Sequence, residues 1–512
     1  MLAGRRYLHV TIGSSFTSVG HLTEPCSCLS FLGFIVRAPS AILGSDHLHD
    51  NRRTKSLSLD HDDDLTSKLR YTIFRQCCIT GPGIRGSEMS ADGAIPTSSS
   101  SSLAAMSNLK TIAGAAAIAC AALAYANHAP VQLPPQAVFI DPRSFAVMGP
   151  NATFREDALD NNTFFNPTAT TPPFFQVFDE AFLQILGPNA TIRQVAVNDT
   201  FAFAHEAPIY NEATDELFFA SNDGGALGMS DLNHNNLYGK ISMKDVDAAF
   251  AANESNINVP VTELDLPDTI QMTNGGTGPY NNSLLLINSG RGPLPPSIAL
   301  VNPLPPNNVT VLLDNYYGRQ FNSLNDIKVH PTNGKIFFTD TIYGFLNEFR
   351  PAPLMPNQVY RFDPDTRAVK VVADGFDKCN GIAFSSDGKT AYVSDTGVVN
   401  GVFGNNQTEP ATIYVFDVDP VSHVFKNRRI LAFVDAGIPD GIQIDTQGNV
   451  YTGTADGTQV FNPDGVLLGK FFLGTTSANM VFAGPGRLAI LAETKIFVAE
   501  IAASGFSLGG PQ

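Results

Sequence analysis

The sequence is constrained most strongly by a repeat with a period of about fifty-five residues. Three segments, residues 325–340, 380–395 and 440–454, align without gaps at their starts. Each consists of an apolar strand, a polar turn containing glycine and a second apolar strand, which is the pattern of a β-hairpin. Weaker copies begin at residues 206, 274 and 479, so successive starts lie 68, 51, 55, 60 and 39 residues apart. A period of this length is typical of radially repeated β-structures.

We therefore predict an all-β fold, a six-bladed β-propeller with four-stranded antiparallel blades around a central channel, over residues 161–512. Radial repetition leaves only short sheet edges, whereas a sandwich or a parallel β-helix does not require hairpins at so long a period. With 43 Gly and 34 Pro the chain is also rich in turns. Because the last unit is short, five or seven blades are the alternatives.

The chain before the propeller has the features of a targeting segment. Lys110, the apolar stretch 111–123 and the A-x-A sequence ending at Ala126 predict a secretory signal peptide over residues 106–126, although a buried Ala-rich helix is the alternative. A signal peptide is recognised at an N-terminus, so we expect Met106 to be the true initiator. Residues 1–105 are then a doubtful upstream extension, disordered or not translated, and residues 127–160 an N-terminal segment.

Asparagine content supports a secreted, extracellular glycoprotein, because Asn51 is the only asparagine before residue 106. Some N-x-S/T sequons arise by chance, but a cluster of them suggests a glycosylated surface. The predicted acceptors are Asn151, Asn161, Asn189, Asn198, Asn253, Asn281, Asn308 and Asn406. The formal net charge of −16 argues against nucleic-acid partners and against binding to an anionic membrane once the signal is cleaved.

A polar residue opens each repeat, just before an apolar strand. If that strand is the innermost of its blade, Glu206, Asn325, Asn380 and Asp440 converge at the mouth of the channel. Two carboxylates and two amide carbonyls suit Ca²⁺ best, with Mg²⁺, Mn²⁺ or Zn²⁺ as alternatives. Asn-Asp, Asn-Gly and Asp-Gly are also common turn dipeptides, which is the competing interpretation.

These phrases, with the Glu206-Ala-Pro opening, resemble the gluconolactonase and regucalcin-like (senescence marker protein) family, and look closest to its secreted fungal lactonohydrolases. The resemblance implies a six-bladed propeller with one catalytic divalent metal in its channel, held by the four residues named above. It also implies that Asn274 and Gly275 belong to a second-blade loop beside the metal and the substrate. Paraoxonases share a similar order of ligands, so the resemblance does not fix the substrate.

One position departs from the sugar-lactonase pattern. An Arg tends to stand two residues before the third-blade Asn in those relatives, and here that position is Ser323, with Arg319 four residues further back. The departure puts an aldonolactone substrate in doubt. We also expect Tyr343 to line the substrate pocket.

The function predicted from this site is opening of a lactone, an intramolecular ester, by water activated at the metal. The metal would polarise the carbonyl, and Asp440 would accept the proton, with His205 and His330 as alternative bases. Two other classes compete: a metal-free propeller enzyme similar to strictosidine synthase, which uses a catalytic Glu, and a non-catalytic ligand-binding propeller.

Overall fold

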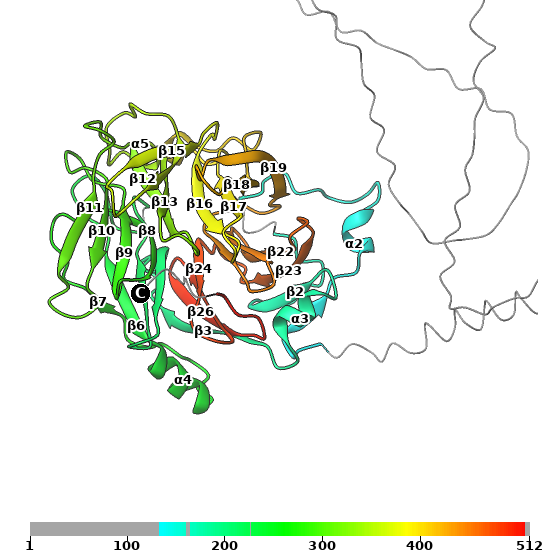
Figure 1. Ribbon diagram of the computed structural model, residues 1–512. Helices are drawn as coiled ribbons and strands as arrows, with labels where there is room; N and C mark the ends of the chain where they lie inside the picture. The colour runs from blue at the N-terminus through cyan, green and yellow to red at the C-terminus, as the bar shows by residue number, and fades with distance from the viewer. Residues whose placement is uncertain (1–132, 160–163, 226, 507–512) are drawn as a thin grey trace, which may run out of the picture. The chain divides into compact units, whose positions relative to one another are not determined.

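The computed structural model describes residues 133–159, 164–225 and 227–506. Their strands form six sheets that stand as blades around a central axis (Figure 1). This confirms the predicted six-bladed propeller. The predicted extension (1–105) and signal peptide (106–126) lie outside the described residues. Within the described part of the chain, no helix has the length and apolar character needed to cross a bilayer.

The innermost strands of the six blades begin at or within three residues of the predicted repeat starts. They are β4 (Glu206–Asn211), β8 (Thr273–Tyr280), β12 (Ser323–Val329), β16 (Cys379–Phe384), β20 (Ile442–Ile444) and β24 (Asn479–Phe482). Successive inner strands pack against one another, and β24 packs against β4, so the ring is closed around the axis.

Each inner strand is followed by antiparallel partners that lead outward. The second strands are β5 (Glu216–Ala220), β9 (Ser283–Asn288), β13 (Ile336–Thr341), β17 (Thr390–Asp395), β21 (Val450–Thr454) and β25 (Arg487–Ala492). The third strands are β6 (Tyr238–Ser242), β10 (Ser297–Val301), β14 (Gln358–Phe362), β18 (Thr412–Val418), β22 (Gly457–Phe461) and β26 (Lys495–Glu500). The outer strands are β7 (Thr262–Glu263), β11 (Val309–Leu313), β15 (Val369–Ala373), β19 (Phe425–Phe433), β23 (Leu467–Phe472) and β3 (Thr191–Val197).

The sixth blade joins the two ends of the propeller. Its first three strands come from the C-terminal part of the chain, and its outer strand is β3, which pairs antiparallel with β26 (Figure 1). The last repeat is short for this reason: its fourth strand is supplied from a position almost three hundred residues earlier in the sequence.

The fifth blade has six strands rather than the predicted four. Segment β2 (Phe174–Val177) pairs with the outer edge of β23, and β1 (Ala137–Phe139) pairs in parallel with β2. Further along, the Arg155 side chain donates to the backbone and the carboxylate of Asp435. The N-terminal segment therefore covers an edge that would otherwise expose unpaired backbone groups.

The core is divided into six apolar clusters, and each cluster fills the space between two neighbouring blades. This follows from the alternation of side chains along a strand, because each blade presents one face to the blade before it and one to the blade after it. Cys379, the single described cysteine, is buried in the cluster between the third and fourth blades.

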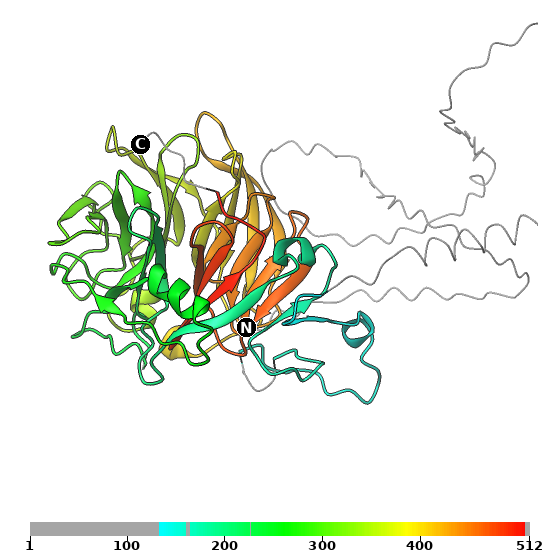
Figure 2. The same cartoon turned by 90° about the horizontal axis from the view of Figure 1, so that it is seen from below.

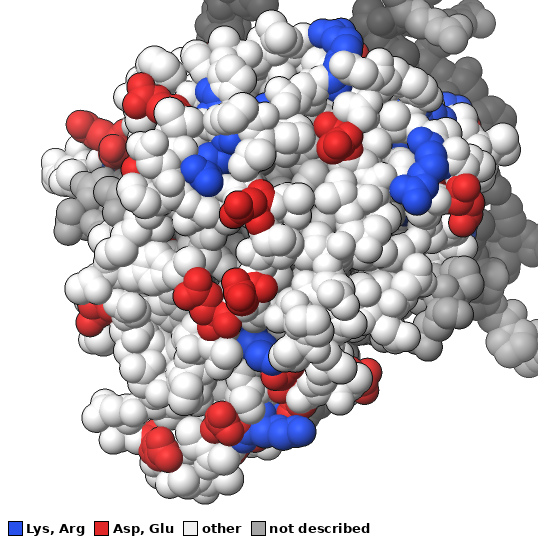
Figure 3. Space-filling model, turned by 90° about the vertical axis from the view of Figure 1, so that its left-hand side faces the viewer, with Lys and Arg blue, Asp and Glu red and all other residues white. Residues whose placement is uncertain are grey.

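Short helices occupy connections and the periphery. They are α2 (Arg143–Ala146), α3 (Phe182–Leu186), α4 (Met243–Ala251), α5 (Tyr343–Leu346) and the 3₁₀ turn η2 (Gly401–Phe403). Figures 1 and 2 place α4 on the outside of the ring. On the face shown in Figure 3, acidic and basic side chains are dispersed among uncharged residues.

Candidate functional site

The polar residues that open the repeats lie at one end of the inner strands. In four of these strands the pairing register shifts at this point, next to Glu206, Asn274, Asn325 and Asn380. A bulge of this kind redirects a side chain that would otherwise follow the pleat. The dipeptides Asn325-Asp326 and Asn380-Gly381 are therefore parts of strands, and the alternative that they are only turns is wrong.

Glycine follows three of the polar residues, Asn274, Asn380 and Asp440, because the neighbouring blade approaches too closely for a side chain. A Cβ atom on Gly381 would lie 2.4 Å from the backbone oxygen of Asp440, and one on Gly275 would lie 2.4 Å from that of Asn325. These contacts bring the start of each inner strand against the start of the next. The polar side chains of adjacent blades are thereby gathered around the axis.

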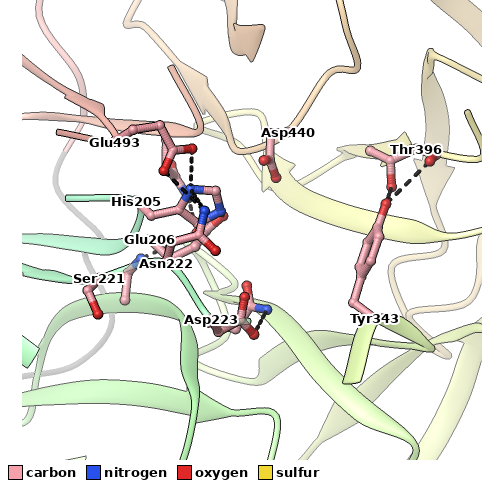
Figure 4. Close-up of polar contacts among 12 residues, drawn as sticks. His205, Glu206, Ser221, Asn222, Asp223, Tyr343, Thr396, Asp440 and Glu493 are labelled. Carbon is pink, nitrogen blue, oxygen red and sulfur yellow. Dashed lines mark hydrogen bonds and ion pairs between the residues drawn. The ribbon is translucent and has the colours of Figure 1, made fainter. Parts of the chain in front are cut away.

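Two of these side chains form a compact group with His205, the residue before β4. One ligand atom from each of His205, Glu206 and Asp440 lies within 4.8 Å of the other two. The first two precede or open β4, whereas Asp440 precedes β20, from which β4 is separated in the ring by the single inner strand β24. In Figure 4, Asp440 lies between the His205–Glu206 group and Tyr343. The predicted convergence of Glu206 and Asp440 is thus observed.

The site contains buried oxygen atoms that have no partner. The Oδ1 atoms of Asn325 and Asp440 are buried and form no hydrogen bond with any described group. Burying a hydrogen-bond acceptor without a donor costs free energy of folding, and a bound cation is one way to satisfy such an acceptor. Glu206, Asn325 and Asn380 are each at most 5% exposed. The donor set therefore fits a divalent cation, which would be held by oxygens of Glu206, Asn325, Asn380 and Asp440.

His205 is held in one orientation by partners from two blades. Its Nδ1 lies 2.6 Å from Oε1 of Glu493, and Oε2 of that glutamate accepts a hydrogen bond from the Asn222 amide at 3.1 Å. Glu493 belongs to the turn between β25 and β26. The imidazole therefore donates through Nδ1, and its Nε2 is directed at Glu206, 3.9 Å from Oε1.

Three carboxyl groups, those of Glu206, Asp440 and Glu493, surround His205 and concentrate negative charge there. Burial by itself lowers the pKa of His205, but the carboxylates of Glu493, Glu206 and Asp440 raise that pKa to about 10. Burial and the mutual repulsion of the two carboxylates raise the pKa of Glu206. Burial also raises the pKa of Asp440, although His205 opposes this shift. A group of carboxylates in this state attracts a cation.

Sequence analysis missed several residues that support the site. Asn479 opens the sixth repeat, and its amide donates to Oε2 of Glu206 at 2.8 Å. Its position in the repeat was the signal that could have identified it. Asp223, in the loop after β5, accepts a hydrogen bond from the Asn274 amide at 2.7 Å. No local motif marks Asp223, Asn222 or Glu493.

Three predicted residues lie elsewhere or have other partners. His330 follows the far end of β12, where its Nε2 bonds to the backbone oxygen of Gly388, so the structure does not bring it to the site. The buried Ser323 hydroxyl accepts from the backbone amide of Gly344. Tyr343 lies across the channel from Glu206 (Figure 4), and its hydroxyl is 2.5 Å from that of Thr396.

The opposite end of the channel opens into a separate cavity of about 860 Å³. Its walls include Tyr210, Thr277 and Phe384, which lie near the far ends of inner strands. Lys328 also lines this cavity, with its ammonium group 3.7 Å from Asp326. The cavity is thus distinct from the carboxylate group at the other end.

The predicted glycosylation acceptors are distributed over the surface. Asn161 lies outside the described residues. The described acceptors are all exposed: Asn151, Asn189, Asn198, Asn253, Asn281, Asn308 and Asn406. Their modification remains a prediction.

Fold and site together define a six-bladed propeller with an axial group of carboxylate, amide and imidazole side chains. The family described as SMP-30/gluconolactonase/LRE-like region matches residues 206–492, which run from the glutamate of β4 to the end of β25. The chain belongs to this family.

Known relatives agree with this assignment. The chain is 30% identical over 316 residues to lactonohydrolase oryL of Aspergillus oryzae, covering 58% of this chain and 67% of the relative. It is 34% identical over 169 residues to a gluconolactonase of Zymomonas mobilis, covering 31% and 44%. A solved gluconolactonase from Xanthomonas campestris is 26% identical, with a TM-score of 0.50 over 65% of this chain and 95% of that structure.

Proposed function

We propose that the protein is a lactonase, a hydrolase that opens a cyclic ester with the aid of a divalent metal. The single observation that carries the proposal is the group of His205, Glu206 and Asp440 on the axis, beside the unpartnered oxygens of Asn325 and Asp440. Membership of a family that includes lactonohydrolases and gluconolactonases supports the choice of substrate class.

The residues around the site have separable roles in this reaction. When bound, the cation supplies a Lewis acid for the lactone carbonyl and for the attacking water. Glu206, Asn325, Asn380 and Asp440 hold it, and Asn479 fixes the carboxylate of Glu206. We assign proton acceptance to Asp440, because its carboxylate stands within 4.8 Å of the ligand atoms of His205 and Glu206, beside the position where the cation would activate water.

Substrate binding is assigned to the walls of the channel beside the metal ligands. Asn274 offers an amide next to Asp223, and Tyr343 offers a ring and a hydroxyl on the other side. Ser323 replaces the arginine expected in sugar lactonases, and its hydroxyl is bound to the backbone amide of Gly344. Without that cationic side chain, we expect a lactone with fewer hydroxyl groups than an aldonolactone.

Hydrolysis of a panel of lactones, measured with and without a chelator, tests the proposal. We expect turnover to stop on metal removal and to return when a divalent metal is added. Replacement Asn380→Ala removes one oxygen donor and is expected to lower kcat/KM by about 100-fold or more. The matched control is Asn427→Ala, an exposed asparagine of the same blade, which should leave kcat/KM unchanged.

Two outcomes would contradict the proposal. Turnover that persists after complete removal of metal would favour the metal-free propeller enzymes similar to strictosidine synthase. No turnover on any lactone of a panel that varies ring size and chain length would favour a non-catalytic binding propeller.

A further inference from the structure

The imidazole of His205 lies beside the carboxylates of Glu206 and Asp440, and only its Nδ1 is used in hydrogen bonding within the described residues. In the neutral tautomer that a metal-bound histidine requires, Nδ1 donates to Glu493 and the lone pair of Nε2 is available to a metal. Among the described residues, no hydrogen bond to Nε2 is found, and the nearest carboxylate oxygen, Oε1 of Glu206, is 3.9 Å away. That distance is too long for a hydrogen bond.

The same distance is normal for two ligands of one ion. Donors that each lie about 2.1 Å from a metal are separated by about 3 to 4 Å. The ligand atoms of His205, Glu206 and Asp440 are all within 4.8 Å of one another, and the unpartnered oxygen of Asn325 comes from β12, the inner strand two blades from β4. The imidazole is therefore within reach of the position that the oxygen donors define.

Glu493 and Asn222 provide the support that a metal-bound histidine requires. Histidine ligands usually donate their second N–H to a carboxylate, which fixes the tautomer and makes the coordinating nitrogen more basic. Here Glu493 accepts from Nδ1 at 2.6 Å and is itself held by the Asn222 amide at 3.1 Å. The hydrogen bond from Asn222 to Glu493 fixes the carboxylate that in turn fixes the imidazole of His205.

We infer that His205 is a metal ligand through Nε2, and that the site consequently favours Mn²⁺ or Zn²⁺ over Ca²⁺. The inference rests on the proposed function, because it concerns the same cation. Oxygen donors alone suit Ca²⁺, whereas an imidazole nitrogen is a ligand that Ca²⁺ rarely takes and that transition metals prefer. His205 is then a positioning and binding group for the metal, and proton acceptance remains with Asp440.

Pulsed electron paramagnetic resonance of the full chain loaded with Mn²⁺, without an affinity tag containing histidine, tests the inference directly. We expect modulation from a directly coordinated ¹⁴N nucleus in the natural protein. His205→Gln should abolish that modulation. His234→Gln, at an exposed histidine paired with Asp231, is the matched control and should retain it.

Equilibrium affinities give a second readout that does not depend on activity. His205→Gln should lower the affinity for Zn²⁺ by about 10- to 100-fold and change the affinity for Ca²⁺ by less than about threefold. Glu493→Gln keeps an acceptor for Nδ1–H but removes its charge. In that variant we expect the ¹⁴N modulation to persist and the Zn²⁺ affinity to fall about tenfold.

The possible outcomes separate the inference from the proposed function. Mn²⁺ that binds without nitrogen modulation, or modulation that survives in His205→Gln, overturns the histidine ligand and leaves a metal-dependent lactonase. Equal losses of Ca²⁺ and Zn²⁺ affinity in His205→Gln overturn it as well. Failure of every divalent metal to bind overturns both the inference and the proposed function.

Discussion

At the residue scale, Asp223 controls which atom of Asn274 can meet a substrate. An ionised carboxylate only accepts hydrogen bonds, so the Asn274 amide turns its NH₂ group toward Asp223 and also toward the hydroxyl of Ser289. The amide oxygen then points away from this pair. Both residues are buried, and because burial raises the pKa of Asp223 to about 7, its carboxylate imposes this orientation above that pH, where it is mostly ionised.

Replacement Asp223→Asn tests this orientation. An amide at residue 223 can either donate or accept, so it no longer dictates how Asn274 turns. We expect KM for a lactone to rise about tenfold, with metal affinity unchanged, because a hydrogen bond to a charged group is lost. Steady-state kinetics on the metal-loaded protein measure the effect. Asp231→Asn, at an exposed aspartate of the same loop, is the control, and an equal rise in both variants would refute the role.

At the scale of the strand, the bulged starts of the inner strands set the positions of the ligands. Gly381 lies against the backbone oxygen of Asp440, and the amide of Gly441 bonds to the backbone oxygen of Ala478. A strand without these glycines would stand further from its neighbour. The repeat of an Asn or Asp followed by Gly is thus a packing requirement of the ring as well as a source of ligands.

Replacement Gly381→Ala tests this packing. The new methyl group would meet the backbone oxygen of Asp440 at 2.4 Å, which is too close for any real contact. We expect the metal affinity to fall at least tenfold and the melting temperature to drop by several degrees, since overpacking costs about 1 to 3 kcal/mol. Calorimetry of metal binding and thermal unfolding measure both. An unchanged metal affinity would show that the approach of the blades does not set the ligand geometry.

At the scale of the whole molecule, the propeller depends on the closure made by β3. Val195 of this strand is fully buried between the sixth and first blades. If the ring opened between these two blades, the side chain of Val195 would be exposed to solvent. Closure places an early segment and the end of the chain in one sheet, and so makes the six repeats one cooperative unit.

Replacement Val195→Asp tests the closure. An unpaired carboxylate in this core should destabilise the protein by about 4 kcal/mol or more, enough to open the ring. Val311→Asp is the matched control, because Val311 also belongs to an outer strand but is 39% exposed. Chemical denaturation should separate the two variants clearly. A similar, small loss in both would mean that β3 is dispensable.

Much of this organisation follows from the sequence by itself. The repeat period and the alternation of apolar residues are local properties, and they determined the six blades, the starts of the inner strands and the polar residues that open them. Asn325, Asn380 and Asp440 were identified for the same reason: each stands at a fixed place in its own repeat.

Only the tertiary structure decided the rest, because the partners come from different blades. Glu493 meets His205 across 288 residues of chain, and Asn479 meets Glu206 across 273. Whether a histidine points at the axis or, like His330, packs at the far end of a strand depends on the direction of that strand. The fifth blade's additional strands likewise pair across the fold. A repeat pattern reflects the strands and turns within each blade, and it carries no information about contacts between side chains of different blades.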